Sequence, residues 1–161
     1  MSKSPADRAV LLNALAPLLE RLIDVDTAAP GAGDALNQAI PLGGALLRPI
    51  EELVRQGVDE GWLAPRGEPG VKFGRVSKPS DDSRGFSIDA VQMDRPGPEH
   101  THPNGEIDLC FTLSGEPSFD GHPPGWVVLP PGSRHVPTVS GGEMAILYFL
   151  PGGAIEFHGL G

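Results

Sequence analysis

Three histidines and one glutamate are spaced so that they could bind one metal ion. His100, His102 and Glu106 lie in one short segment, and His135 follows in a second segment. Imidazole binds Zn, Cu, Fe and Ni, and a carboxylate adds negative charge, so this is a good ligand set for a divalent transition metal. Side chains two positions apart on a β-strand point to the same side, so His100 and His102 can reach one ion together. Glu106 has the same parity, with an expected bend or bulge at Pro103-Asn104-Gly105.

The second segment has its own turn signal. Pro130-Pro131-Gly132 turns the chain sharply, and His135 is expected at the start of the next strand. Histidines near turns are often only solvated, so a polar pocket without metal is the alternative interpretation. The chain has only 5 histidines, however, and most of them fall into this two-part pattern, which favours a metal site. The same ligands serve Fe, Mn, Ni, Co and Zn, so the pattern does not identify the ion.

Composition limits the partners and the compartment. A chain of 161 residues fits one ordinary domain with a real core. Its net charge of −9 argues against nucleic acid and against an anionic membrane surface, but not against a small anionic substrate. A single cysteine excludes an internal disulfide and favours a reducing compartment. The N-terminus has no signal-peptide apolar core and no run is long enough to span a bilayer, so we expect a cytoplasmic protein.

The hydrophobic period changes along the chain from helical to strand-like. Apolar residues recur at helical spacing from Val10 to Ile23, where Pro17 is expected to kink or divide the helix. Further helices are expected over 34–40 and from 43 or 45 to about 60, where Gly61 ends the last one. Residues 1–66 are therefore predicted to be helical, and residues 67–161 to form a β-sandwich or barrel. The expected strands are 71–76, 86–91, 106–113, 126–129 and 143–150.

The strand that begins at Glu106 alternates strictly between polar and apolar residues. If Glu106 faces the metal, Asp108, Cys110 and Thr112 share its face, which indicates a reaction chamber or binding cavity rather than an apolar core. The alternative is that Asp108 is solvated outside and the apolar face forms the core. In the first case the N-terminal helices, a second subunit or another sheet must cover the apolar face, which favours a homodimer. That face carries Ile107, Leu109, Phe111 and Leu113.

The two segments together resemble the metal-binding motifs of the cupin superfamily. The first motif is matched by Gly97, His100, His102, Glu106 and Gly115, and the second by Gly125, Pro130, Gly132 and His135. Val139 stands where the second motif usually has Asn, and the glycine spacings around the first motif also depart from the pattern. The resemblance covers about residues 70–158. It implies a mainly β fold, a single cupin (jelly-roll) barrel with the metal inside, preceded here by the helical segment.

Three further stretches look like the bacterial 4-hydroxylaminobenzoate lyases. They are His102 to Asp108, Phe119-Asp-Gly with Gly125-Trp126, and the tail from Leu150 to His158. The resemblance implies a metal-dependent lyase that converts 4-hydroxylaminobenzoate to 3,4-dihydroxybenzoate with release of ammonia. Asp108 is then the candidate for proton transfer.

Such a substrate is a small aromatic carboxylate and needs a cation in the protein. Arg134 is the nearest candidate by sequence, with Arg75 or Lys72 as alternatives, although its parity opposes that of His135. Cys110 is a further candidate for the substrate pocket, more as a small buried thiol than as a nucleophile.

Two further residues, Tyr148 and His158, are expected to have mainly structural roles. Tyr148 is expected to pack in the core with its hydroxyl bonded. His158 is expected to anchor the tail, or else to close over the pocket.

Other functions use the same ligands. A cupin dioxygenase or isomerase is the second hypothesis, a non-catalytic ligand-binding barrel the third and a structural-metal protein the weakest. Three histidines and one glutamate leave coordination positions open, which favours catalysis over a structural role.

Overall fold

Three helices precede nine strands in the computed structural model, which describes residues 4–158. The helices are α1 (Ser4–Leu22), α2 (Ala32–Ala39) and α3 (Arg48–Glu60). The strands are β1 (Arg66–Glu68), β2 (Val71–Ser77), β3 (Phe86–Met93), β4 (His100–His102), β5 (Glu106–Phe119), β6 (Gly125–Leu129), β7 (Ser133–His135), β8 (Val139–Pro151) and β9 (Glu156–Phe157).

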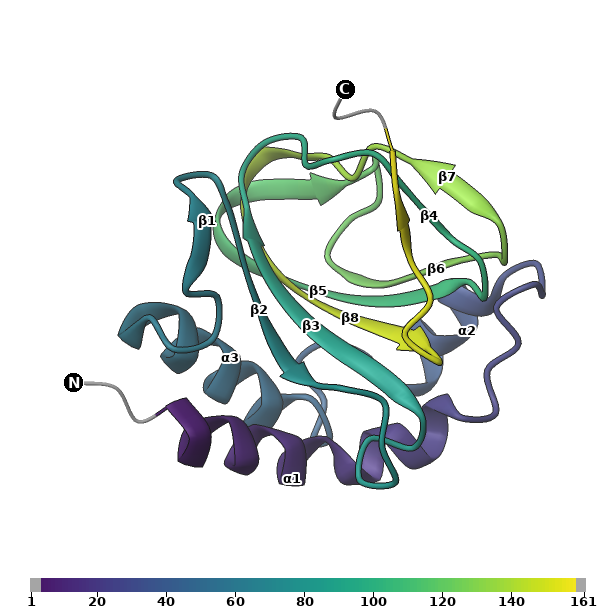
Figure 1. Cartoon of the computed structure of the whole chain (residues 1–161), viewed down its shortest axis with the longest axis horizontal. Coiled ribbons are helices and arrows are strands. Elements are labelled where there is room, and N and C mark those ends of the chain that lie inside the picture. The colour runs from purple at the N-terminus through teal and green to yellow at the C-terminus, as the bar shows by residue number, and fades with distance from the viewer. Residues whose placement is uncertain (1–3, 159–161) are drawn as a thin grey trace.

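The strands form a large sheet and a small one. The six-stranded sheet has the order β1-β2-β3-β8-β5-β6, and the three-stranded sheet the order β7-β4-β9. All the strand pairs in both sheets are antiparallel. The large sheet curves around, with β4 and β7 on one side of it and the helices along the other (Figure 1). The predicted mainly β barrel with an N-terminal helical segment is confirmed.

The two faces of the large sheet belong to two separate hydrophobic clusters. The outer face packs against the helices, and the inner face lines the barrel. Because side chains alternate along each strand, neighbouring residues of β5 and β8 enter different clusters. The outer cluster includes Leu11, Leu15, Leu18, Leu19, Leu36 and Val54 from the helices and Ile88, Ile107, Leu109, Phe111, Leu147 and Phe149 from the strands. The inner cluster holds Met93, Cys110, Phe119, Val127, Val139, Met144, Ile146, Tyr148 and Leu150.

This packing answers the question of what covers the apolar face of β5. The N-terminal helices do, so the surplus apolar surface that favoured a dimer is already buried within one chain. A homodimer remains a prediction, but the apolar face of β5 no longer supports it. The inner face also differs from expectation, because β3, β6 and β8 add apolar side chains around the polar residues of β5.

The edge of the large sheet is closed by a polar contact with α2. The Asn37 side chain accepts a hydrogen bond from the Trp126 backbone N–H (2.8 Å) and donates one to the Trp126 carbonyl (3.2 Å). The Trp126 indole N–H donates to the Ile40 carbonyl (2.8 Å). The backbone N–H and carbonyl of Trp126 on edge strand β6 are satisfied in this way, which blocks pairing with another chain at this residue.

Some element boundaries differ from the sequence-based expectation. Helix α1 continues through Pro17 and is not divided in two. Helix α3 begins later than expected, at Arg48, and ends as predicted at Gly61, which has a left-handed φ of 82°. Strand β5 extends to Phe119 through register irregularities near Gly115, which a simple alternation pattern does not show. Within residues 4–158, no helix is both long and apolar enough to cross a membrane.

Candidate metal centre

The four predicted ligands come from three strands that meet at one end of the barrel. His100 of β4 lies opposite His135 of β7 in the register, so their side chains point the same way. After β4 the chain turns at Gly105, which has a φ of 85° and whose N–H donates to the His102 carbonyl (3.0 Å). This tight turn, predicted from Pro103-Asn104-Gly105, brings Glu106 at the start of β5 back to the two histidines.

The ligand atoms lie close together around the Glu106 carboxylate. His102 Nε2 is 2.7 Å and His135 Nε2 is 2.9 Å from Glu106 Oε1, and His100 Nε2 is 3.9 Å from it. The His100 and His135 Nε2 atoms are 2.9 Å apart. One ligand atom from each of the four residues lies within 4.8 Å of all the others. The structure therefore brings together the four residues that the sequence pattern selected.

The donor set fits a metal ion. Two ligands at about 2.1 Å from one ion and at right angles are about 3 Å apart, close to the shortest spacings here. Two neutral imidazole nitrogens facing each other at 2.9 Å repel unless a proton or cation lies between them. Glu106 Oε2 is buried without a hydrogen-bond partner in the described chain, and His102 Nε2, although close to Glu106 Oε1, makes no well-aligned hydrogen bond. Buried polar atoms of this kind need a partner, and an ion could supply it.

The surroundings of these groups shift their pKa values in different directions. Burial and the nearby His102 lower the pKa of His100 to about 4. Burial would also lower the pKa of His135, but hydrogen bonds with Asp120 and Glu106 raise it to about 9. Burial would raise the pKa of Glu106, yet interactions with Asp108, His102 and His135 outweigh this effect and lower the pKa.

Asp120 is a neighbour of the cluster that the sequence interpretation missed as a functional residue. Its Oδ2 lies 2.6 Å from His135 Nδ1, on the side of the ring away from Glu106. Asp120 precedes Gly121 in the turn between β5 and β6, so its sequence context indicates only a turn. No local signal predicts that this turn reaches His135, because the contact depends on the folding of β5 against β8.

Asp108 lies on the inner face beside Glu106, as predicted. It is fully buried, and neither of its carboxyl oxygens has a hydrogen-bond partner within residues 4–158. Burial and the nearby Glu106 carboxylate raise the pKa of Asp108 well above its usual value. Cys110 follows on the same face and is also fully buried. The alternative in which Asp108 is solvated outside the barrel is therefore wrong.

A row of polar residues crosses the inner face from Asp108. In the register, Asp108 pairs with Tyr148 of β8, Tyr148 with Asp89 of β3, and Asp89 with Arg75 of β2. The Arg75 guanidinium bonds the Asp89 carboxylate at 2.8 Å. Tyr148 is only 8% exposed and packs in the inner cluster, so the expected core packing is confirmed. Arg75 therefore shares the face of Asp108.

The other two candidate cations lie elsewhere. Arg134 pairs in register with Thr101, whose parity is opposite to that of the histidines, and its guanidinium bonds Glu99 at 2.9 Å. More than half of the Arg134 side chain is exposed. Lys72 has the parity opposite to Arg75 on β2. Arg134, the first candidate for the substrate carboxylate, therefore points away from the histidines, as its parity indicated.

The C-terminal strand is tied to the strand that carries two of the ligands. Strand β9 pairs with β4, the His158 N–H donates to the Glu99 carbonyl (2.9 Å), and the His158 ring lies 2.6 Å from the Thr101 hydroxyl. His158 thus anchors the tail, as expected.

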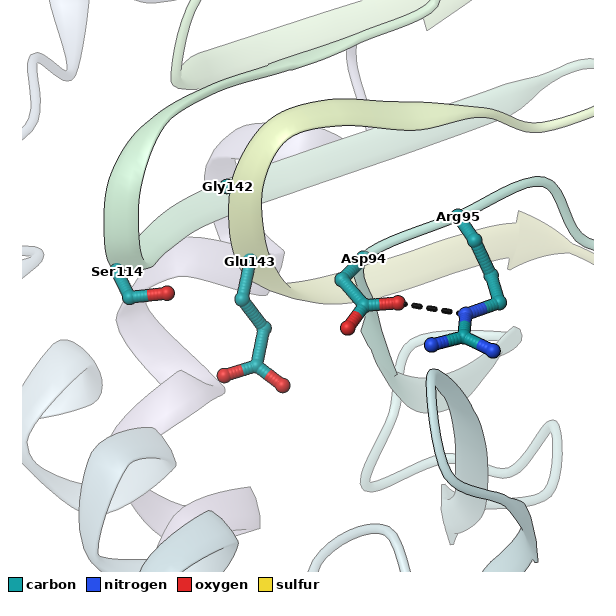
Figure 2. Close-up of a pocket in the computed structure, with 5 residues that line it drawn as sticks. All are labelled: Asp94, Arg95, Ser114, Gly142 and Glu143. Carbon is teal, nitrogen blue, oxygen red and sulfur yellow. Dashed lines mark hydrogen bonds and ion pairs between the residues drawn. The ribbon is translucent and has the colours of Figure 1, made fainter.

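A surface hollow lies apart from this cluster. It is lined by Asp94, Arg95, Ser114, Gly142 and Glu143, near the bend where β5 pairs with β8 (Figure 2). The Asp94 carboxylate already bonds Arg95, and Glu143 accepts a hydrogen bond from Gln92. This hollow shares no residue with the histidine cluster, and its carboxylates have partners, so it is the weaker candidate for a chemical site.

Comparison with protein-family models gives a match over residues 16–157 to the family described as PnbB, 4-hydroxylaminobenzoate lyase. The chain belongs to this family. It is 32% identical over 157 residues to a 4-hydroxylaminobenzoate lyase of Nocardioides sp. (strain LMS-CY), covering 91% of this chain and 92% of the relative. It is 34% identical over 128 residues to the Pseudomonas putida protein of the same name, covering 67% and 72%. The family resemblance stated from the motifs is confirmed, and the chain is an enzyme of a lyase family.

Solved structures give more distant similarities. A cupin protein from Ralstonia eutropha matches with a TM-score of 0.41 and 18% identity, covering 56% of this chain and 61% of that one. An oxalate oxidase bound to glycolate matches with a TM-score of 0.41 and 19% identity, covering 56% of each chain.

Proposed function

We propose that this chain is a metal-dependent lyase that converts 4-hydroxylaminobenzoate to 3,4-dihydroxybenzoate and ammonia. The observation that carries the proposal is the convergence of His100, His102, Glu106 and His135 on one point inside the barrel. Membership in the lyase family supports the substrate and the reaction. The convergence supports the metal, since three imidazoles and one carboxylate leave coordination positions for a substrate.

The overall reaction consumes one water. The N–O bond of the hydroxylamine breaks and its oxygen leaves as water. One water adds to the ring carbon beside the carbon that bears the nitrogen, and a second replaces the nitrogen, which leaves as ammonia. A divalent ion held by the four ligands would supply Lewis acidity toward the hydroxylamine oxygen.

Protons must move at both stages, and Asp108 is the proposed carrier. A proton is needed on the departing oxygen, and a proton must be taken from each attacking water. Asp108 lies on the inner face two positions from Glu106, fully buried, with both oxygens unpartnered within the described residues. An unpartnered buried carboxyl group is unfavourable unless a ligand or water meets it, so its position supports contact with the reacting group.

Arg75 is the proposed partner of the substrate carboxylate. It lies on the same face as Asp108, three strands away, which is about 14 Å at the usual spacing of about 4.8 Å between strands. The two functional groups of the substrate lie at opposite ends of its ring, and the long arginine side chain can cover the remaining distance. Each arginine is paired with a carboxylate, Arg75 with Asp89 and Arg134 with Glu99, but Arg134 has the parity opposite to that of the histidines. Cys110, which is buried next to this row, would line the space for the ring.

The test is metal analysis of the purified protein, followed by an assay without oxygen. We expect a divalent metal bound in a one-to-one ratio and conversion of 4-hydroxylaminobenzoate, followed by the absorbance of 3,4-dihydroxybenzoate and by ammonia. Metal-loaded protein that leaves this compound unchanged would refute the lyase assignment. Activity that requires oxygen would instead favour the dioxygenase hypothesis.

A further inference from the structure

Asp120 holds His135 through a carboxylate whose two oxygens are both occupied. Asp120 Oδ2 accepts a hydrogen bond from His135 Nδ1 at 2.6 Å. Asp120 Oδ1 accepts a hydrogen bond from the Thr138 backbone N–H at 2.8 Å. The carboxylate therefore bridges the imidazole and the backbone just beyond β7, and it cannot rotate without breaking one of the two bonds.

The backbone around Asp120 is itself fixed. The Asp120 N–H donates to the Thr138 carbonyl at 2.8 Å, so Asp120 and Thr138 are joined by a side-chain bond and a backbone bond. Phe119 and His122 exchange backbone hydrogen bonds of 2.8 Å across the turn. Asp120 has a φ of 50°, a left-handed conformation that aspartate and asparagine adopt more readily than most residues. The side chain thus extends from a tight, well-bonded turn.

This arrangement determines which nitrogen of His135 faces the cluster. A carboxylate accepts hydrogen bonds and cannot donate, so Nδ1 must carry the proton in the bond with Asp120. The other nitrogen, Nε2, then points to Glu106 Oε1 at 2.9 Å and can present its lone pair. Only 15% of the His135 side chain and 19% of the Asp120 side chain are exposed, so water competes little for this bond.

We propose that Asp120 is a positioning residue that fixes the tautomer and ring orientation of His135 for metal binding. Outer partners of this kind fix the orientation of ligating histidines and increase their basicity, and their loss typically costs 10- to 100-fold in metal affinity. The proposal rests on the metal centre alone and not on the identity of the substrate.

The test uses the isosteric variant Asp120→Asn. The asparagine has one acceptor oxygen for two donors, so either Thr138 N–H or His135 Nδ1–H loses its partner. If the amide nitrogen faces the ring, it favours the wrong tautomer. Asparagine tolerates the left-handed backbone, so we expect the variant to fold. The matched control is Asp94→Asn, which removes the same charge at a surface residue outside the cluster.

The first readout is Zn²⁺ affinity, measured by competition with a chromophoric chelator in the absence of substrate. We expect Asp120→Asn to bind Zn²⁺ roughly 10- to 100-fold more weakly and Asp94→Asn to bind as the wild type does. The second readout is the ¹⁵N spectrum of the imidazoles in the Zn²⁺-loaded proteins. We expect a protonated Nδ1 of His135 in the wild type and a changed signal in Asp120→Asn.

Two outcomes would contradict the proposal. A folded Asp120→Asn protein with wild-type Zn²⁺ affinity and an unchanged His135 signal would show that Asp120 does not position the ring. A wild-type protein that binds no Zn²⁺, Mn²⁺ or Fe²⁺ would overturn both this proposal and the metal centre. Failure of the lyase assay alone would not change either measurement.

Discussion

Metal binding should release a proton from His135 at neutral pH. Hydrogen bonds to Asp120 and Glu106 raise the pKa of His135 to about 9, against the opposing effect of burial. A protonated imidazole carries hydrogen on both nitrogens and cannot bind a metal, so the ion must displace the Nε2 proton. The Nδ1 proton stays in the bond with Asp120. Below pH 9, protons and metal therefore compete for the same nitrogen.

The size of the effect follows from the pKa values. At pH 7, two units below a pKa of about 9, close to all of the His135 side chains carry the extra proton. Each metal ion bound should then release about one proton from His135, and the metal affinity should rise about tenfold per pH unit from pH 7 toward 9. His100, with a pKa of about 4, has already lost its proton in this range and adds nothing to the slope.

The assay is calorimetric titration of the metal-free protein with Zn²⁺ in buffers of different ionisation enthalpy, between pH 7 and 8.5. The dependence of the heat on the buffer gives the number of protons released. Asp120→Asn should release fewer protons at pH 7, because the pKa of its His135 falls with the loss of the carboxylate. A wild-type affinity that is constant over this range would show that His135 is already neutral and that this electrostatic reasoning is wrong.

Three further predictions concern the inner face of the large sheet, which carries Asp108 and Arg75, and its outer face, which carries Leu109. Asp108→Asn should lower kcat by about 10²- to 10⁴-fold, the usual contribution of a proton-transfer group, with metal content unchanged by elemental analysis. Arg75→Ala should raise KM about 10- to 100-fold, as expected for loss of a charge-assisted hydrogen bond with the substrate, whereas Arg134→Ala should leave KM unchanged. If steady-state kinetics show the opposite order, Arg134 and not Arg75 binds the substrate carboxylate. Leu109→Ala should lower the free energy of unfolding by about 2–5 kcal/mol in urea titrations, and the exposed Val10→Ala by less than about 0.5 kcal/mol; equal losses would contradict the packing.

The metal ligands could be predicted because their geometry is local. His100 and His102 share a face by strand parity, and the bend at Gly105 that returns Glu106 to them is encoded in the adjacent residues. His135 required one longer step, which the turn at residues 130–132 and the two-part motif supplied, although His135 ends β7 rather than beginning a strand as expected. The outward direction of Arg134 also followed from parity alone.

The contacts that the sequence could not predict depend on the register between distant strands. Asp120 meets His135 only because β5 and β8 pair as far as Phe119 and Val139, beyond the irregularities near Gly115. Arg75 shares a face with Asp108 only through three successive strand pairings. Strand parity gives the face within one strand, but the register sets which face of one strand continues that of another.

Strand β5 explains how the helical segment can affect the metal centre. Glu106 and Asp108 point into the barrel, while Ile107 and Leu109 point to the helices and are at most 1% exposed. A slip of one residue in the register of β5 would exchange these two sets, placing carboxylates among the apolar residues of the outer cluster. Burial of unpaired carboxylates there would be costly, so helix packing selects the register that puts Glu106 beside the histidines. The N-terminal helices are thus expected to maintain the candidate metal centre through the opposite face of the same strand.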